Sequence, residues 1–149
     1  MFARFFRRPG WAVLVALLPL LLIAGHASAE VVTPPKGSPE RAAILDAVRP
    51  MAEAELGAPV EFVVREMRVI GEWAFVILEP QRPGGGKIEY AYTRYQEAVD
   101  EGIFGGEVIA LLRETPKGWL TYEYELGSTD VPWVDWPNFY PVPPEIFPH

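Results

Sequence analysis

The sequence predicts an α+β domain: an N-terminal helix packed on a four-stranded antiparallel meander sheet, with a short second helix and a C-terminal strap rich in proline and aromatic residues. Residues 73–78 and 108–112 are apolar at every position, which is typical of strands covered on both faces. Residues 119–126 alternate between apolar and polar side chains, as an edge strand with one exposed face does. Residues 38–56 carry apolar side chains at intervals of three and four, the spacing of an amphipathic helix.

Residues 1–29 have the features of an export signal. Three arginines precede an apolar run at residues 11–24, which is shorter than the ~20 residues that span a bilayer. Ala27 and Ala29 then form the small-x-small pattern of a signal peptidase site. We expect cleavage after Ala29 and a periplasmic or secreted product. A permanent N-terminal anchor is the alternative, and membrane contact is expected only through this segment when it is uncleaved.

The mature chain would be strongly acidic. Residues 30–149 hold 10 Lys and Arg against 20 Asp and Glu, a formal charge of −10. Phosphate backbones and anionic lipids would repel such a chain, which argues against nucleic-acid and membrane-surface binding. A basic protein or a cationic ligand would be attracted, although acidity also serves solubility. The chain has no cysteine, so it has no disulfide framework.

The first helix begins after a polar lead. We expect residues 30–37 to be a flexible lead and residues 38–149 to form a single domain. Ser38 is a good N-cap, and Pro39 suits the first helical position. Pro50 removes one helical hydrogen bond, so we expect a kink or a break next to it.

A β-hairpin is predicted from residues 60–69 and 73–78. They flank Gly71 and Glu72, and glycine at the first position of a two-residue loop suits a type II′ turn. The alternation of the first strand is blurred near Arg65.

The segment that follows, residues 81–87 (QRPGGGK), is expected to be a flexible turn. Gly86 and Lys87 resemble the end of a phosphate-binding loop, but Ile88 stands where serine or threonine would coordinate magnesium. We therefore expect no nucleotide and no other cofactor.

Thr93 and Gln96 have the form of a capping box, which predicts that the short second helix begins after Thr93. Tyr90 and Tyr92 are candidate binding residues in the same stretch. They either line a ligand groove or pack at the edge of a layer.

The last strand, residues 119–126, is expected to alternate without interruption at one edge of the sheet. Its apolar face would hold Leu120, Tyr122, Tyr124 and Leu126, and its polar face Thr121, Glu123 and Glu125. Carboxylates that point outward discourage unwanted pairing at a sheet edge.

Six of the nineteen residues from 131 to 149 are proline, and five are aromatic. We expect this strap to lie over the sheet face that the first helix leaves bare, with the short second helix helping to cover it.

Histidine and cysteine chemistry is nearly absent. His26 would leave with the signal, so the mature chain keeps only His149. A Ser-His-Asp triad, a Cys-His pair and a histidine-ligated metal site are therefore disfavoured.

Asp130 and Asp135 are the remaining catalytic candidates. They stand near Trp133 and Trp136, and sites that cleave sugars combine carboxylates with aromatic side chains. The segment 128–130 equally fits a turn in which side chains bond backbone amides. Trp133 and Trp136 are also candidate binding residues. No metal site is expected, because the alternating acids of a calcium loop are absent.

Residues 41–49, 73–76, 108–112 and 127–131, with the two tryptophans that follow, resemble a group of small, functionally uncharacterised exported proteins of Gram-negative bacteria. A helix followed by a curled antiparallel sheet is also similar to the cystatin-like and nuclear-transport-factor-like folds. Those folds host inhibitors, ligand binders and occasional enzymes, so the resemblance implies an architecture and leaves the function open.

We expect an exported, non-catalytic binding or accessory domain for a protein or a cell-envelope component. One alternative is a carboxylate-dependent cell-wall or polysaccharide hydrolase that uses Asp130 and Asp135. The other is an acidic inhibitor of a basic secreted enzyme.

Overall fold

The computed structural model describes residues 30–149, so the predicted export signal and its cleavage site lie outside the described residues. The elements are α1 (Pro39–Leu56), β1 (Glu61–Ile70), β2 (Trp73–Gln81), α2 (Gln96–Asp100), β3 (Val108–Thr115), β4 (Gly118–Leu126), η1 (Pro132–Val134), α3 (Trp136–Phe139) and η2 (Pro144–Ile146). The four strands form one antiparallel sheet in the order β1-β2-β3-β4. The predicted α+β meander is confirmed. None of the helices within residues 30–149 has the length and apolar character needed to cross a bilayer.

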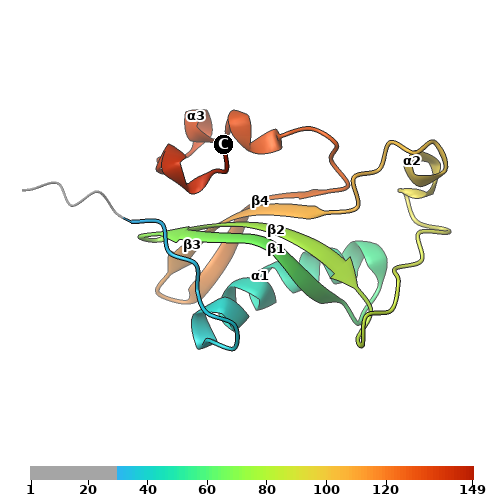
Figure 1. The fold of residues 1–149 in the computed structure, drawn as a ribbon, viewed down its shortest axis with the longest axis horizontal. Helices are drawn as coiled ribbons and strands as arrows, with labels where there is room; N and C mark the ends of the chain where they lie inside the picture. The colour runs from blue at the N-terminus through green and yellow to red at the C-terminus, as the bar shows by residue number, and fades with distance from the viewer. Residues whose placement is uncertain (1–29) are drawn as a thin grey trace, which may run out of the picture.

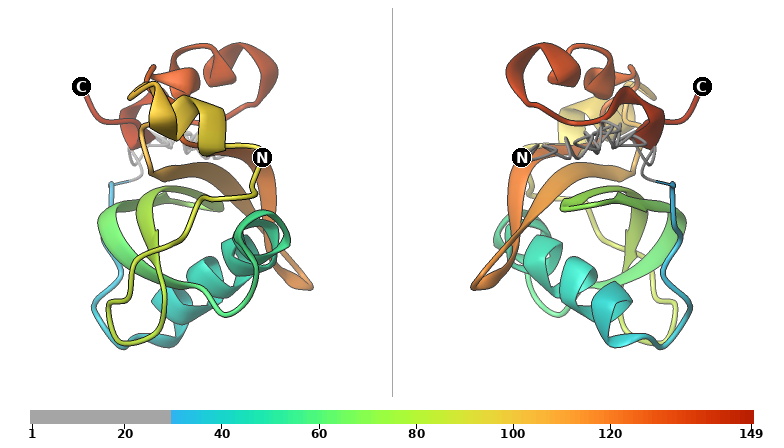
Figure 2. Two further views of the ribbon diagram at one scale, coloured as in Figure 1. Left: turned by 90° about the vertical axis from the view of Figure 1, so that its right-hand side faces the viewer. Right: turned by 90° about the vertical axis from the view of Figure 1, so that its left-hand side faces the viewer.

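The two central strands divide their side chains between two apolar clusters. The α1-side cluster takes Ala74, Val76 and Leu78 from β2 and Val108, Ala110 and Leu112 from β3. The strap-side cluster takes Trp73, Phe75, Ile109 and Leu111. Figures 1 and 2 show α1 on one face of the sheet and the C-terminal strap (residues 131–149) on the other. Both faces of β2 and β3 are therefore covered, as the unbroken apolar runs predicted.

α1 is one continuous helix, so of the two outcomes expected at Pro50, a kink or a break, the break does not occur. The Ser38 hydroxyl accepts a hydrogen bond from the Arg41 amide at 3.3 Å and caps the first turn. The apolar stripe is buried on both sides of Pro50, at Ile44, Val48, Ala52 and Leu56. Because tertiary packing of such a stripe supplies most of the stability of a helix, it offsets the hydrogen bond that Pro50 removes.

The β1–β2 hairpin forms as predicted. Ile70 pairs with Trp73, so Gly71 and Glu72 make the loop, and Gly71 has the positive φ that the first position of a type II′ turn needs. A β-bulge at Arg65 explains the blurred alternation of β1.

β4 does not alternate without interruption, which corrects the prediction. Its pairing with β3 shifts by one residue at Tyr122. Trp119 and Tyr124 consequently both pack against the α1-side cluster, although one is at an odd and the other at an even position. Leu120 and Tyr122, expected inside, are 54% and 38% exposed. A bulge depends on pairing with the neighbouring strand and is not visible in the strand's own pattern.

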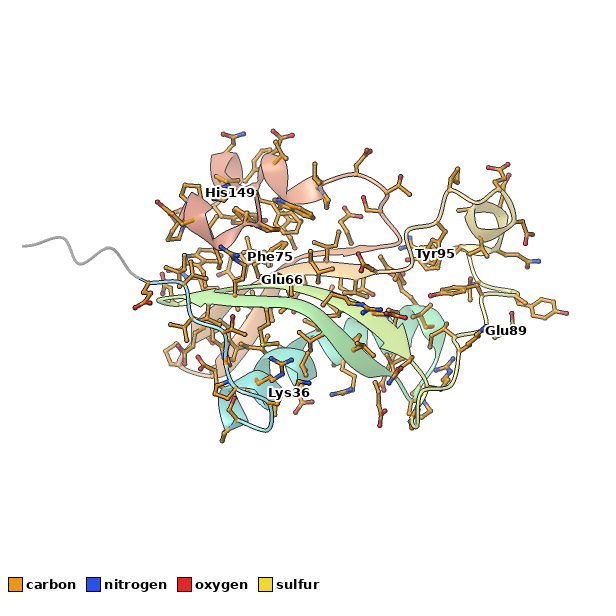
Figure 3. All side chains as sticks on the ribbon, in the orientation of Figure 1. Lys36, Glu66, Phe75, Glu89, Tyr95 and His149 are labelled. Atoms are coloured by element: carbon orange, nitrogen blue, oxygen red, sulfur yellow. The ribbon has the colours of Figure 1, made fainter. Side chains whose placement is uncertain are left out.

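The strap covers the strap-side cluster with aromatic rings. Phe75 makes edge-to-face contacts with Trp133, Trp136 and Phe147, with ring centroids 5.3, 6.3 and 5.3 Å apart. Figure 3 shows Phe75 on the side of the sheet that faces the strap. The expected help from the second helix is wrong, because α2 lies at one end of the sheet and buries none of its five residues.

Replacing Phe75 by alanine tests the strap-side cluster. Because Phe75 is fully buried between three aromatic rings, Phe75→Ala is expected to lower the free energy of unfolding by about 3–5 kcal/mol. Phe139 is 73% exposed on the strap, so Phe139→Ala is expected to change it by less than about 0.5 kcal/mol. Urea denaturation followed by circular dichroism measures both, and equal losses would show that Phe75 is not in a covered core.

Candidate functional site

The connection between β2 and β3 is much longer than a hairpin requires. It runs from residue 82 to residue 107, whereas adjacent antiparallel strands are usually joined by two to five residues. Its residues 88–106, which we call the lobe, extend past the end of the sheet and carry α2 (Figure 1). Long connections of this kind often carry the functional residues of a domain.

β2 and β3 stop pairing at the end of the sheet next to the lobe. β2 pairs with β3 only as far as Leu78, which lies opposite Val108, and residues 79–81 pair with β1 alone. The chain before β3 turns instead to the end of β4: the Gly105 amide donates to the Gly127 carbonyl at 2.9 Å. Between the two diverging segments lies an open cleft of about 430 Å³, which we call the splay cleft, lined by residues 79–81, 85–88, 90 and 105–107.

Two glycines hold the cleft open. A Cβ on Gly105 would lie 2.2 Å from the carbonyl oxygen of Ser128, and a Cβ on Gly127 would lie 1.9 Å from the ring of Phe104. Neither distance is possible for a real side chain, so the chain before β3 can lie this close to residues 127–128 only with glycine at both positions.

The opposite wall of the splay cleft is the turn at residues 82–86, which is hydrogen-bonded to the end of α1. The Arg82 amide donates to the Gly86 carbonyl at 2.7 Å and closes the turn. The Arg82 guanidinium donates to the carbonyls of Leu56 at 2.7 Å and Pro59 at 2.9 Å, which satisfies backbone acceptors at the C-terminal end of α1. The turn that the sequence predicted is therefore anchored to the helix.

The cleft is lined by charges of both signs. Glu79 lies on β2, Glu107 lies on the facing segment, and Lys87 follows the glycine turn. Glu79 also pairs with Arg65 on β1. Burial raises the pKa of the Tyr90 hydroxyl, and the charge of Glu79 raises it further. The cleft combines an open strand edge with two carboxylates, which suits an extended backbone that carries a cationic side chain.

Tyr90 packs in the lobe, one of the two alternatives from the sequence, and it also lines the splay cleft. Its ring contacts Phe104 at 4.8 Å, and Phe104 contacts Tyr95 at 5.2 Å. Arg94 joins this group to α1, with one nitrogen 2.9 Å from the carboxylate of Glu55. Figure 3 shows Tyr95 and Glu89 at the lobe end of the molecule.

Tyr92 has a different environment, because its side chain is fully exposed at 101%. It has a φ of +66°, in a turn closed by the Thr93 amide and the Tyr90 carbonyl at 3.1 Å. Glycine or asparagine normally occupies a position with positive φ, and another residue costs about 1–2 kcal/mol there.

The predicted capping box does not form. α2 begins at Gln96 with Tyr95 at the N-cap position, so Thr93 is not the cap. The two side chains stabilise the preceding turn instead: Gln96 accepts from the Tyr92 amide at 3.0 Å, and the Thr93 hydroxyl donates to the Tyr90 carbonyl at 2.7 Å. The same residue types thus cap a turn, because the positive φ of Tyr92 redirects the chain before the helix starts.

The structure places the predicted catalytic candidates on the strap side. Asp130 and Asp135 are both exposed, and the Asp130 amide donates to the Ser128 hydroxyl at 3.3 Å in a turn. The indole rings of Trp133 and Trp136 face Phe75 in the strap-side cluster, and Trp136 is only 6% exposed. Neither aspartate lines the splay cleft. Within residues 30–149, no group of three or more His, Cys, Asp or Glu side chains is arranged to hold a metal ion.

Sequence reasoning missed the splay cleft and its charged residues Glu79, Lys87 and Glu107. The available signals were the long connection between two central strands and the pair Gly105-Gly106 before β3. The close approach of Gly105 to Ser128 could not be predicted, since it depends on backbone segments distant in the sequence.

No family model, no curated protein and no solved structure matches the chain. The resemblance to exported proteins of Gram-negative bacteria therefore stays a prediction.

The hydroxyl of Tyr124, beneath the lobe, provides a test of this region. It is buried and, among the described residues, has no hydrogen-bond partner; burial raises its pKa, and the charge of Glu55 raises it further. Because an unsatisfied buried hydroxyl costs stability, Tyr124→Phe is expected to raise the free energy of unfolding at pH 7 by up to ~1 kcal/mol.

The pH dependence has a definite sign. A pKa raised above the unfolded value of about 10 gives stability that is complete below pH 10 and is lost as the pH rises toward the folded pKa. Tyr124→Phe should therefore lose less stability between pH 9 and 11 than the unmodified chain, with exposed Tyr92→Phe as the control. Chemical denaturation at each pH measures this, and parallel losses in all three proteins would contradict it.

Proposed function

We propose that this chain is an exported, non-catalytic binding domain that holds an extended peptide segment of a basic partner in the splay cleft. The observation that carries the proposal is the open edge of β2, where residues 79–81 have a paired strand on one side only.

An unpaired strand edge presents backbone donors and acceptors that a peptide can use by strand addition. Strand alternation directs the amides of Glu79 and Gln81 toward β1, so at the open edge β2 offers the carbonyl of Pro80, which has no amide hydrogen. Because Gly105 holds the chain before β3 against residues 127–128, β3 cannot occupy this edge itself. A peptide can therefore reach this edge without any movement of the sheet.

The charge distribution supports a basic partner. Each of the seven arginines within residues 30–149 donates to a carboxylate or a backbone carbonyl of the protein itself. After all ten basic residues of this range are counted, ten acidic residues remain in excess. Such a field attracts cationic chains and speeds their encounter with the cleft. An inhibitor of a basic secreted enzyme would fall within this class of binding domain.

Panning a random heptapeptide phage library against the domain tests the proposal. The protein is to be recovered from the periplasm of a Gram-negative host, where its first residue is expected to be Glu30. Enriched peptides are expected to contain Lys or Arg and to shift the amide resonances of Glu79, Gln81 and residues 105–107.

Lys87→Trp, which places a large ring at the cleft, is expected to weaken these peptides about tenfold or more. Lys117→Trp makes the same change of charge and size on the exposed β3–β4 turn and should bind as the unmodified domain does. A library with no enriched peptides, or equal affinities for the two variants, would refute the cleft as the binding site.

A further inference from the structure

The side chain of Tyr92 in the lobe contributes no packing to the core. Tyr92 buries no part of its side chain and has a positive φ that glycine would adopt without strain. A residue that is both strained and unburied weakens the fold, and such positions are found where the structure meets a ligand or partner.

Hydrogen bonds within residues 89–96 fix the backbone conformation of Tyr92. Gln96 accepts its amide hydrogen at 3.0 Å, Thr93 closes the turn onto Tyr90 at 3.1 Å, and the carboxylate of Glu89 accepts from the Ala91 amide at 3.1 Å. A preorganised tyrosine has only two side-chain torsions to order on binding, which makes it an efficient anchor at interfaces.

The surface around Tyr92 indicates the chemistry of the partner. Val99 and Ile103 of the lobe are 38% and 58% exposed, so apolar side chains other than Tyr92 also face solvent there. The lobe has four acids, Glu89, Glu97, Asp100 and Glu101, and its one base, Arg94, is paired with Glu55. An apolar anchor with an acidic surround complements an apolar pocket with a basic rim.

We infer that Tyr92 is the anchor by which the lobe docks into an apolar pocket, rimmed by Lys and Arg, on a folded partner protein. The inference goes beyond the peptide cleft and does not require that the cleft be occupied. Charge disfavours the other occupants: a second copy of residues 30–149 carries the same formal charge of −10, and anionic membranes and nucleic acids are also negative.

Site-specific photo-crosslinking tests the docking surface in the full chain. The photoreactive amino acid benzoylphenylalanine is placed at position 92 and, in a control, at Leu120, which is 54% exposed at the start of β4, the far end of the strand from the lobe. After irradiation in cells, mass spectrometry is expected to identify a protein of net positive charge at position 92 and not at position 120. The yield should fall in high salt.

Four other results would overturn the inference: an adduct of twice the mass of the chain, a lipid or nucleic-acid adduct, an acidic protein, or no adduct specific to position 92. A second measurement then separates docking from folding. With the cross-linked protein purified, Tyr92→Ala is expected to weaken its binding about 30-fold, the loss typical of an interface anchor.

Tyr92→Gly should lose the same affinity without a lower melting temperature, since glycine suits the positive φ. Lys87→Trp should leave this affinity unchanged, which distinguishes the docking surface from the splay cleft. Unchanged binding by Tyr92→Gly would refute the anchor.

Discussion

The structure depends on one constraint: β2 and β3 are apolar on both faces and must be covered on both. Alternate side chains of the two strands enter separate clusters, with Val76 and Ala110 toward α1 and Phe75 and Leu111 toward the strap. Neither cover is sufficient alone, because removing either would expose a row of buried apolar side chains to water. The chain has no disulfide to compensate, so the order helix, sheet, strap follows from the need to cover both faces.

That constraint is local enough to be predicted from the sequence. The doubly apolar runs, the glycine of the hairpin loop and the aromatic strap are visible in the residues themselves. The features that could not be predicted depend on distant neighbours. The bulge at Tyr122 reflects its pairing with β3, and the continuity of α1 past Pro50 reflects packing on the sheet.

The candidate site also has one part that is visible in the sequence and another that depends on residues distant in the chain. Tyr90 and Tyr92 were identified as binding candidates because aromatic side chains in a turn-rich stretch are visible in the sequence. The cleft was not, because it exists only where two glycines let the chain before β3 approach β4. α1 and the strap cover the two faces of the sheet, and the splay cleft lies at the end next to the lobe. We therefore propose that binding occurs at that end, where the cleft backbone, its charged side chains and the ring of Tyr92 are all exposed.

Hydrogen exchange of the backbone amides tests the central claim most directly. If β2 and β3 form a core covered on both faces, the slowest amides, at positions such as Val76 and Ala110, should open with the same free energy as global unfolding. The lobe amides should exchange far faster. Exchange of the β2 and β3 amides at a free energy well below that of global unfolding would show that one cover detaches independently, and would contradict the account.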